Sequence, residues 1–302
     1  MQNVMYHYVR PISQNYPYFK NLDIETFKRQ LDYFEDEYGF ISKEDYFYAI
    51  KNRKKIDGVV LSFDDGLKDH YLHVLPELKK RNLWGTFYIT TGIYNKKNIK
   101  LLGVHRVHFL IGKYGASKIL EEILKMINTN MLDKKNINQF DKEIYNCGNY
   151  DKDSKELRRL LNFYLKYEYR DIILDKLMTK YFDEKELFEE TYLSVKELKE
   201  ITKSGNILGS HTVHHPVLSR LSNEDQYKEI YESFEFLSKI YNMNYKSFCY
   251  PYGYKSSYND ITLKILDQLK IDDAVIFDNA LQNLPIKKYE LSRIDCNQFI
   301  KI

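Results

Sequence analysis

Two adjacent carboxylates follow a short apolar run early in the chain. The run 59–63 (VVLSF) is typical of a buried strand, and Asp64, Asp65 and Gly66 come directly after it. Neighbouring residues of a strand point to opposite faces, so both carboxylates reach one site only if the chain bends at Gly66. The alternative is an Asp-Gly turn in which one Asp caps a helix. A pair at the carboxyl end of a barrel strand indicates one metal ligand and one base.

Histidines gather after a second apolar run. Three of the eight histidines in the chain are His211, His214 and His215. Positions i and i+4 can share a metal on a helical turn, but Pro216 disfavours helical dihedral angles at His215. A tight loop is therefore expected. The spacing leaves open whether His214 or His215 is the second ligand beside His211.

A third cluster is aromatic and contains proline and glycine. Tyr250, Pro251, Tyr252 and Gly253 follow the apolar run 246–249. Turns with Pro and Gly are common, so the motif alone is weak. Its position after a third predicted strand favours a role at the same site.

The elements that must position these clusters alternate along the chain. Short β-branched runs and helical patterns predict βα units around a parallel sheet or barrel. The expected strands are 3–6, 59–63, 86–89, 207–209, 246–249, 274–277 and 291–294. Asp23 and Ser222 are expected to begin helices. Ser194 and Glu197 form a capping box, and Gly205 should end that helix.

One stretch interrupts this alternation. Residues 95–191 contain no convincing strand, only amphipathic patterns such as 119–127 and 157–177. We expect a helical insertion within a single domain that spans residues 1–302. His105 and His108, at i and i+3, would share one face of a helix. That face either covers the site or has only a structural role, packed in the core or exposed to solvent. The structural role is favoured.

Composition limits the class of protein. The 302 residues carry 46 Lys and Arg against 43 Asp and Glu, and a net charge of +3 predicts no nucleic-acid partner. The 28 Tyr and 17 Phe indicate compositional drift rather than sugar-stacking faces. Cys147, Cys249 and Cys296 are too widely spaced to indicate disulfides or a zinc ribbon. Without a signal-like or membrane-spanning segment, a cytoplasmic location is expected, and the oligomeric state stays open.

Taken together, the three clusters resemble the polysaccharide deacetylase family, also called NodB-homology domains or carbohydrate esterase family four. Residues 62–66 (SFDDG) look like its first motif, 211–216 (HTVHHP) like its second and 250–253 (YPYG) like a variant of its third. The runs 4–7 and 85–88 are also similar. The resemblance covers residues 1–95 and 192–295.

The resemblance implies a distorted (β/α)7 barrel that removes an acyl group, usually acetyl, from an amino sugar. By motif position, Asp65, His211 and His215 would bind one divalent metal, and zinc fits this ligand set best. Asp64 would be the general base for a water whose pKa the ion lowers. The backbone N–H of Tyr252 would help to stabilise the oxyanion.

The sequence also departs from the family pattern. Cys249 stands where the third motif often has an arginine, and no histidine follows His215, so the usual general acid is missing. Arg293, near the end of the last predicted strand, is the candidate to orient the base. The proton for the leaving amine would come from Asp64 itself or from His7, at the end of the first strand.

The sequence therefore predicts a metal-dependent sugar N-deacylase. An expected cytoplasmic location favours a nucleotide-linked or lipid-linked sugar used in surface glycan synthesis. The alternatives are an amide or formamide hydrolase acting on another small molecule, and a barrel that binds acylated sugars without turnover. The four residues Asp64, Asp65, His211 and His215 argue against a pure binding protein.

Overall fold

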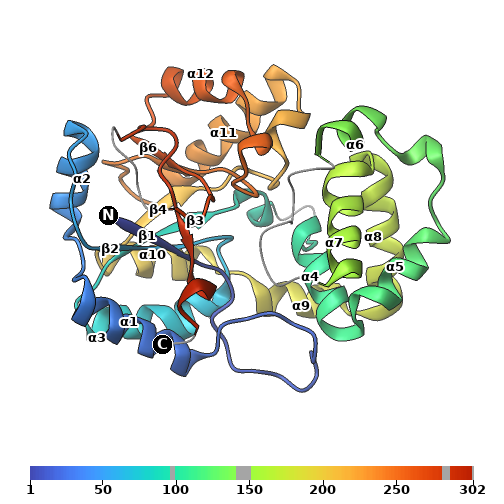
Figure 1. Ribbon diagram of the computed structural model, residues 1–302, viewed down its shortest axis with the longest axis horizontal. Coiled ribbons are helices and arrows are strands. Elements are labelled where there is room, and N and C mark those ends of the chain that lie inside the picture. Colours follow the sequence, from blue (N-terminus) through green and yellow to red (C-terminus); the bar gives the residue numbers. More distant parts are fainter. Residues whose placement is uncertain (96–98, 141–150, 281–285, 301–302) are drawn as a thin grey trace. The chain divides into compact units, whose positions relative to one another are not determined.

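The computed structural model of the chain describes residues 1–95, 99–140, 151–280 and 286–300 (Figure 1). The chain divides into two compact units. The first comprises residues 1–12, 21–96 and 191–302, and the second comprises residues 13–20 and 97–190. Cys147 lies outside the described residues.

A sheet of seven parallel strands forms the centre of the first unit. Its spatial order is β6-β5-β4-β3-β2-β1-β7. The strands are β1 (Gln2–Tyr6), β2 (Val59–Phe63), β3 (Gly85–Ile89), β4 (Ile207–Ser210), β5 (Ser247–Cys249), β6 (Asp273–Val275) and β7 (Ile294–Asp295). The predicted strands are confirmed with small shifts at their ends. The largest shift is at β7, because Leu291 bonds to β6 and pairing with β1 starts only at Ile294.

The chain segment that leads into β7 connects both edges of this sheet. Leu291 donates its N–H to Ala274 O and accepts from Ile276 N, both at 2.9 Å. Three residues later, Ile294 pairs with Val4 of β1. The sheet therefore curls into the distorted seven-stranded barrel that the resemblance implied.

Alternate residues of the strands face two different cores. Leu61 and Phe63 of β2 pack in a large cluster with apolar residues of four helices, whereas Val60 packs in a smaller cluster with Tyr88 and Cys249. The four helices are α1 (Ile24–Glu37), α3 (Leu75–Lys80), α10 (Val195–Lys203) and α11 (Asn223–Ser238). The first unit also contains α2 (Lys43–Asn52) and α12 (Asp260–Gln268). Figure 1 shows the strands surrounded by these helices.

The predicted helix starts are confirmed. Asp23 accepts from Thr26 N at 3.0 Å at the start of α1, and Ser222 caps α11. Ser194 and Glu197 form the capping box of α10. Gly205 follows the end of that helix with a φ of +85°, a conformation that glycine adopts without strain.

Helices make up the second unit (Figure 1). They are α4 (Gly103–Tyr114), α5 (Ala116–Leu124), α6 (Lys134–Phe140), α7 (Lys152–Arg159), α8 (Tyr167–Tyr181) and α9 (Glu184–Thr191). The amphipathic stretch 157–177 is divided between α7 and α8. The reason is Leu165, which is extended and pairs in an isolated bridge with Leu132.

A buried arginine ties α4 to two other helices of this unit. Arg106 donates to Glu184 through Nε at 2.6 Å and Nη2 at 2.9 Å, and to Asp175 through Nη1 at 2.9 Å. His105 and His108 also lie on α4, with ring centroids 6.0 Å apart, and His105 is fully buried. The described helices include none that is long and apolar enough to span a membrane.

A buried carboxylate marks the start of β6. Asp273 is fully buried and accepts hydrogen bonds from Tyr46 OH and Tyr245 OH, each at 2.6 Å, and from Ser247 Oγ. Burial raises the pKa of Asp273, and the three donated hydrogen bonds oppose the shift without cancelling it. The folded protein therefore holds a proton on this group more tightly than the unfolded chain does.

Asp273→Asn is expected to change how stability depends on pH. Because the folded pKa lies above the unfolded value of about 3.9, protonated Asp273 contributes stability below that value, and this contribution is lost as the pH rises through the folded pKa. Asparagine has no proton to lose, so the stability of wild type relative to the variant should fall as the pH rises. Urea unfolding at a series of pH values measures this difference. An increase with pH would contradict the assignment, and Asp272→Asn is the control.

Candidate active site

The two adjacent aspartates lie at the carboxyl end of β2. Asp65 has a φ of +77° and Gly66 a φ of +70°, so the chain bends at Asp65 as well as at the predicted Gly66. Both aspartates are buried. His7 Nε2 lies 3.8 Å from Asp64 Oδ2 and 4.0 Å from Asp65 Oδ2, which shows that the bend brings both carboxylates to one place.

Asp65 lies against two of the clustered histidines. Its Oδ1 is 3.4 Å from His211 Nε2 and 3.6 Å from His215 Nε2, and one donor atom from each residue falls within 4.8 Å of the others. Ligands bound tetrahedrally at about 2.1 Å from one ion stand about 3.4 Å apart. The donor set of two imidazoles and one carboxylate therefore fits a single divalent metal.

The hydrogen bond of His211 supports the same assignment. Its Nδ1 donates to Cys249 O at 2.8 Å, which leaves Nε2 as the nitrogen that faces Asp65. Burial lowers the pKa of His211 against the opposing charges of Asp64 and Asp65. The neutral imidazole that a metal requires is thus the favoured form.

The segment 211–215 forms a loop, as Pro216 predicted. Thr212 and His215 have positive φ values of 65° and 57°. These conformations turn His215 toward Asp65, whereas the His214 side chain is 68% exposed and bonds to Glu229 on α11. The structure thus brings His215, and not His214, together with His211 and Asp65.

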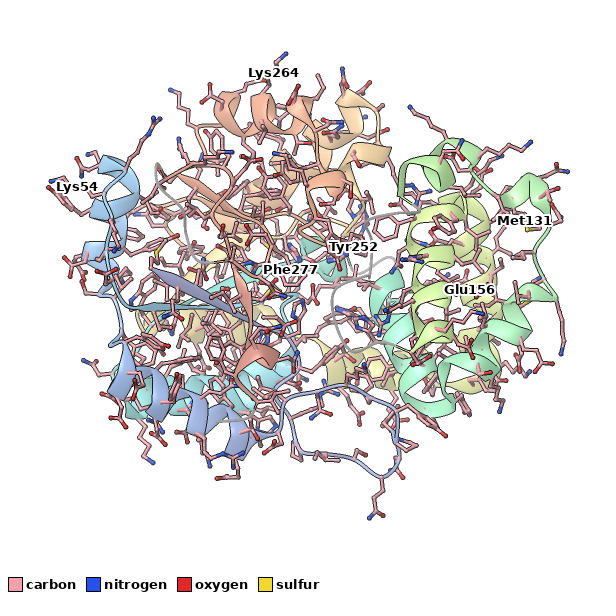
Figure 2. The ribbon with its side chains drawn as sticks, viewed as in Figure 1. Lys54, Met131, Glu156, Tyr252, Lys264 and Phe277 are labelled. Atoms are coloured by element: carbon pink, nitrogen blue, oxygen red, sulfur yellow. The ribbon has the colours of Figure 1, made fainter. Side chains whose placement is uncertain are left out.

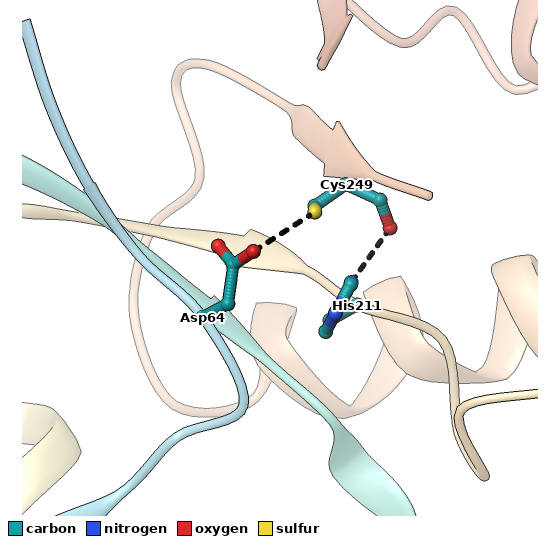
Figure 3. A group of neighbouring side chains, drawn as sticks. All are labelled: Asp64, His211 and Cys249. Atoms are coloured by element: carbon teal, nitrogen blue, oxygen red, sulfur yellow. Dashed lines mark hydrogen bonds between the residues drawn. The ribbon is translucent and has the colours of Figure 1, made fainter. Parts of the chain in front are cut away.

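Asp64 is held by Cys249 of β5 and by Arg293, which directly precedes β7. Arg293 Nη1 donates to Asp64 Oδ1 at 2.8 Å, and the Cys249 thiol lies 3.6 Å from Oδ2 (Figure 3). Burial alone would raise the pKa of Asp64, but the positive charge of Arg293, with smaller contributions from His7 and His211, lowers it below its ordinary value. Asp64 is therefore ionised, as a general base must be.

Cys249 contacts an arginine, Arg293, that is distant in the sequence. Arg293 is only 2% exposed, and its Nη2 lies 3.0 Å from Cys249 Sγ. Asp64, His211 and Cys249 also form a compact group of possible metal ligands (Figure 3). The guanidinium beside Asp64 and the thiol, whose pKa burial raises, make that group unsuitable for a cation. The structure places Arg293 against Asp64, and its role of orienting the base stays a prediction.

The third predicted cluster forms a strained turn beside the histidines. Tyr252 has a φ of +65°, and its ring packs edge-on against His215 with centroids 4.9 Å apart. Gly253 follows with a φ of +69°, and a Cβ there would stand 2.7 Å from Phe277 Cβ. Tyr252 and Phe277 are labelled in Figure 2. The role of the Tyr252 N–H at an oxyanion stays a prediction.

His7 is more accessible than the two carboxylates that it faces. It follows β1, and 39% of its side chain is exposed, compared with 2% for that of Asp64. Its carbonyl lies 2.8 Å from Nε2 of the buried His70, which fixes the backbone at this point. The structure places His7 beside both carboxylates, where a proton donor would be needed.

The sequence analysis missed one residue of this region. Glu229 binds the histidine loop from α11, 15 residues after His214. No motif marks it, because it is one of several acidic residues on an amphipathic helix.

Comparisons with known proteins agree with this geometry. Residues 175–274 match the family model described as Polysaccharide deacetylase. The match contains the histidine loop and the Tyr252 turn, whereas Asp64 and Asp65 lie outside it. No curated protein matches the chain in sequence.

Solved structures share the fold along almost the whole chain. The Streptococcus pyogenes deacetylase PplD in complex with acetate is 21% identical, with a TM-score of 0.60 over 98% of this chain and 91% of that one. IcaB from Ammonifex degensii is 18% identical, with a TM-score of 0.55 over 97% and 90%. A de-N-acetylase from Aggregatibacter actinomycetemcomitans is 14% identical, with a TM-score of 0.55 over 97% and 93%.

Proposed function

We propose that the chain is a member of the polysaccharide deacetylase family, whose model matches residues 175–274, and that it is a metal-dependent hydrolase that removes an N-acyl group from an amino sugar. The observation that carries this proposal is the buried Asp65, His211 and His215 group, with Asp64 beside it and paired with Arg293. Acetyl is the proposed acyl group, which is supported by the acetate bound to PplD.

The proposed roles follow from the position of each side chain. Asp65, His211 and His215 would hold the ion, with zinc as the proposed metal. When bound, a divalent ion lowers the pKa of a coordinated water and polarises a carbonyl. Asp64 accepts the proton of the attacking water, while Arg293 holds its carboxylate in place.

The leaving amine requires a proton, because an amide nitrogen does not depart as an anion. We assign this proton to His7, whose Nε2 lies 3.8 Å from the Asp64 carboxylate and whose side chain is 39% exposed. The N–H of Tyr252 is proposed to donate to the oxyanion.

His7→Ala is expected to lower kcat on an amide substrate by about 10²–10⁴-fold, the usual contribution of a general acid. The loss should be much smaller on an activated ester, whose leaving group needs little protonation. Steady-state kinetics on both substrates measure the difference, and His73→Ala is the control. A normal amide rate in His7→Ala would show instead that Asp64 carries the proton to the nitrogen.

An acyl-release screen tests the proposed function. The metal-loaded protein is incubated with N-acetylated and N-formylated amino sugars that are nucleotide-linked, lipid-linked or polymeric, and acetate and formate are measured. Release of acetate from an amino sugar supports the proposal, and the preferred carrier tests the proposed nucleotide-linked or lipid-linked substrate. Release only from other small amides would support a different amide hydrolase. Sugar binding without release would support a non-catalytic barrel.

A cytoplasmic location remains part of the proposal. Cell fractionation with an antibody against the protein tests it.

A further inference from the structure

A carboxylate that is not part of the proposed active site, that of Glu229, binds the histidine loop, residues 211–215. Glu229 Oε2 accepts from Val213 N at 2.9 Å and from His214 N at 2.8 Å, and Glu229 Oε1 lies 2.7 Å from His214 Nδ1. Only 13% of the Glu229 side chain is exposed. Consecutive backbone N–H groups that converge on one carboxylate oxygen form a strong anion-binding arrangement.

The loop is also held from its opposite side. Thr91 N donates to Thr212 O at 3.0 Å, and Gly92 N donates to Val213 O at 2.8 Å. A Cβ on Gly92 would stand 2.6 Å from Val213 O, so the two backbones are in close contact. The short helix Thr91–Tyr94, which follows β3, therefore fixes two carbonyl groups of the loop, and Glu229 fixes two of its N–H groups.

A second residue of α11 contacts the start of the same loop. Ser233, one helical turn after Glu229, hydrogen-bonds through Oγ to Ser210 Oγ, which also accepts from Thr212 N at 3.3 Å. One face of α11 thus contacts the loop immediately before His211 and immediately before His215.

The residues that Glu229 holds lie between two strained positions. Thr212 and His215 both have left-handed φ values, which are unfavourable for residues other than glycine and persist only when the surroundings enforce them. Thr212 is also β-branched, which makes this conformation rarer still. Without Glu229, Val213 and His214 lose their acceptor, and the loop can relax toward ordinary dihedral angles. Relaxation would carry His215 Nε2 away from Asp65.

We propose that Glu229 is a positioning residue that sets the metal affinity of the site by holding the histidine loop in its strained form. The inference rests on the proposed metal site. Glu229 does not touch the ligand atoms, and its effect passes through the backbone of residues 213 and 214.

Metal affinity measured by competition with a chromogenic chelator, with Zn²⁺ as the probe, tests this role. Glu229→Ala is expected to weaken Zn²⁺ binding by about 10–100-fold, the usual effect of losing a group that orients a ligand. Glu229→Gln keeps one side-chain oxygen for the two N–H groups and should show a smaller loss. Glu232→Ala, on the exposed face of the same helix, is the matched control and should bind as wild type does.

His214→Ala separates the backbone contacts from the side-chain contact. It removes only the ring that meets Glu229, so it should keep Zn²⁺ affinity close to wild type. The visible spectrum of the Co²⁺-loaded protein should change in Glu229→Ala and stay unchanged in His214→Ala. A general loss of stability would not change the spectrum of the bound metal. Circular dichroism verifies folding, and Glu229→Gln gives the answer if the alanine variant does not fold.

The proposal is overturned if both Glu229 variants bind Zn²⁺ like wild type, or if His214→Ala loses as much affinity as Glu229→Ala. His211→Ala distinguishes this failure from failure of the metal site itself. If His211→Ala binds Zn²⁺ normally, the proposed ligand set is wrong. If it loses the metal while Glu229→Ala does not, only the positioning role is wrong.

Discussion

Asp64→Asn is expected to reduce kcat by at least about 10²–10⁴-fold, the range for loss of a general base, while the metal content stays at the wild-type level. The amide has nearly the same shape as the carboxylate but accepts no proton. Arg293 Nη1 lies 2.8 Å from Asp64 Oδ1, and the amide oxygen of asparagine can accept the same hydrogen bond. The folded site should therefore survive. Kinetics of acyl release and metal analysis of the same preparation measure the two quantities.

Asp69→Asn is the matched control for this variant. Asp69 is also a buried carboxylate that pairs with an arginine, Arg10, whose Nε lies 2.6 Å from it, and Asp69 is not one of the proposed metal ligands. It should change kcat little. Near-normal turnover in Asp64→Asn would contradict the base assignment. Loss of metal from Asp64→Asn would make Asp64 a ligand, as in the alternative group with His211 and Cys249.

His211→Ala is expected to empty the metal site, and His214→Ala is expected to leave it filled. The reason is the direction of the side chains: His211 Nε2 lies 3.4 Å from Asp65 Oδ1, whereas the His214 ring is exposed and faces Glu229. Asp65→Asn and His215→Ala should behave like His211→Ala. The metal content of each purified variant decides the matter, and equal loss in His211→Ala and His214→Ala would contradict the assignment.

The strands and the site could largely be predicted because their signals are local. A run of β-branched residues specifies a buried strand, and in a parallel sheet the carboxyl ends of all strands meet at one edge. Residues that directly follow strands, such as Asp64, Asp65 and His211, are therefore brought together by topology alone. The choice of His215 over His214 came from the family resemblance. The structure supplies a physical reason, which is the positive φ at Thr212 and His215.

Other features could not be predicted because they depend on distant contacts. Glu229 looks like any acidic residue of an amphipathic helix, and only the packing of α11 against the histidine loop gives it a role. The break between α7 and α8 follows from the pairing of Leu165 with Leu132, 33 positions earlier in the sequence numbering. Residues 13–20 belong to the second unit, although nothing in their pattern separates them from their neighbours.

The segment that closes the barrel also carries Arg293, the partner of the proposed catalytic base. Arg293 stands 229 positions after Asp64, so their contact forms only when this last segment docks on the sheet. A chain in which the segment has not docked would already contain the proposed metal ligands that follow β2 and β4, but Asp64 would lack its guanidinium. Full hydrolytic activity would then arise only when the last strand docks between β6 and β1. Completion of the fold and activation of the enzyme would be one and the same event.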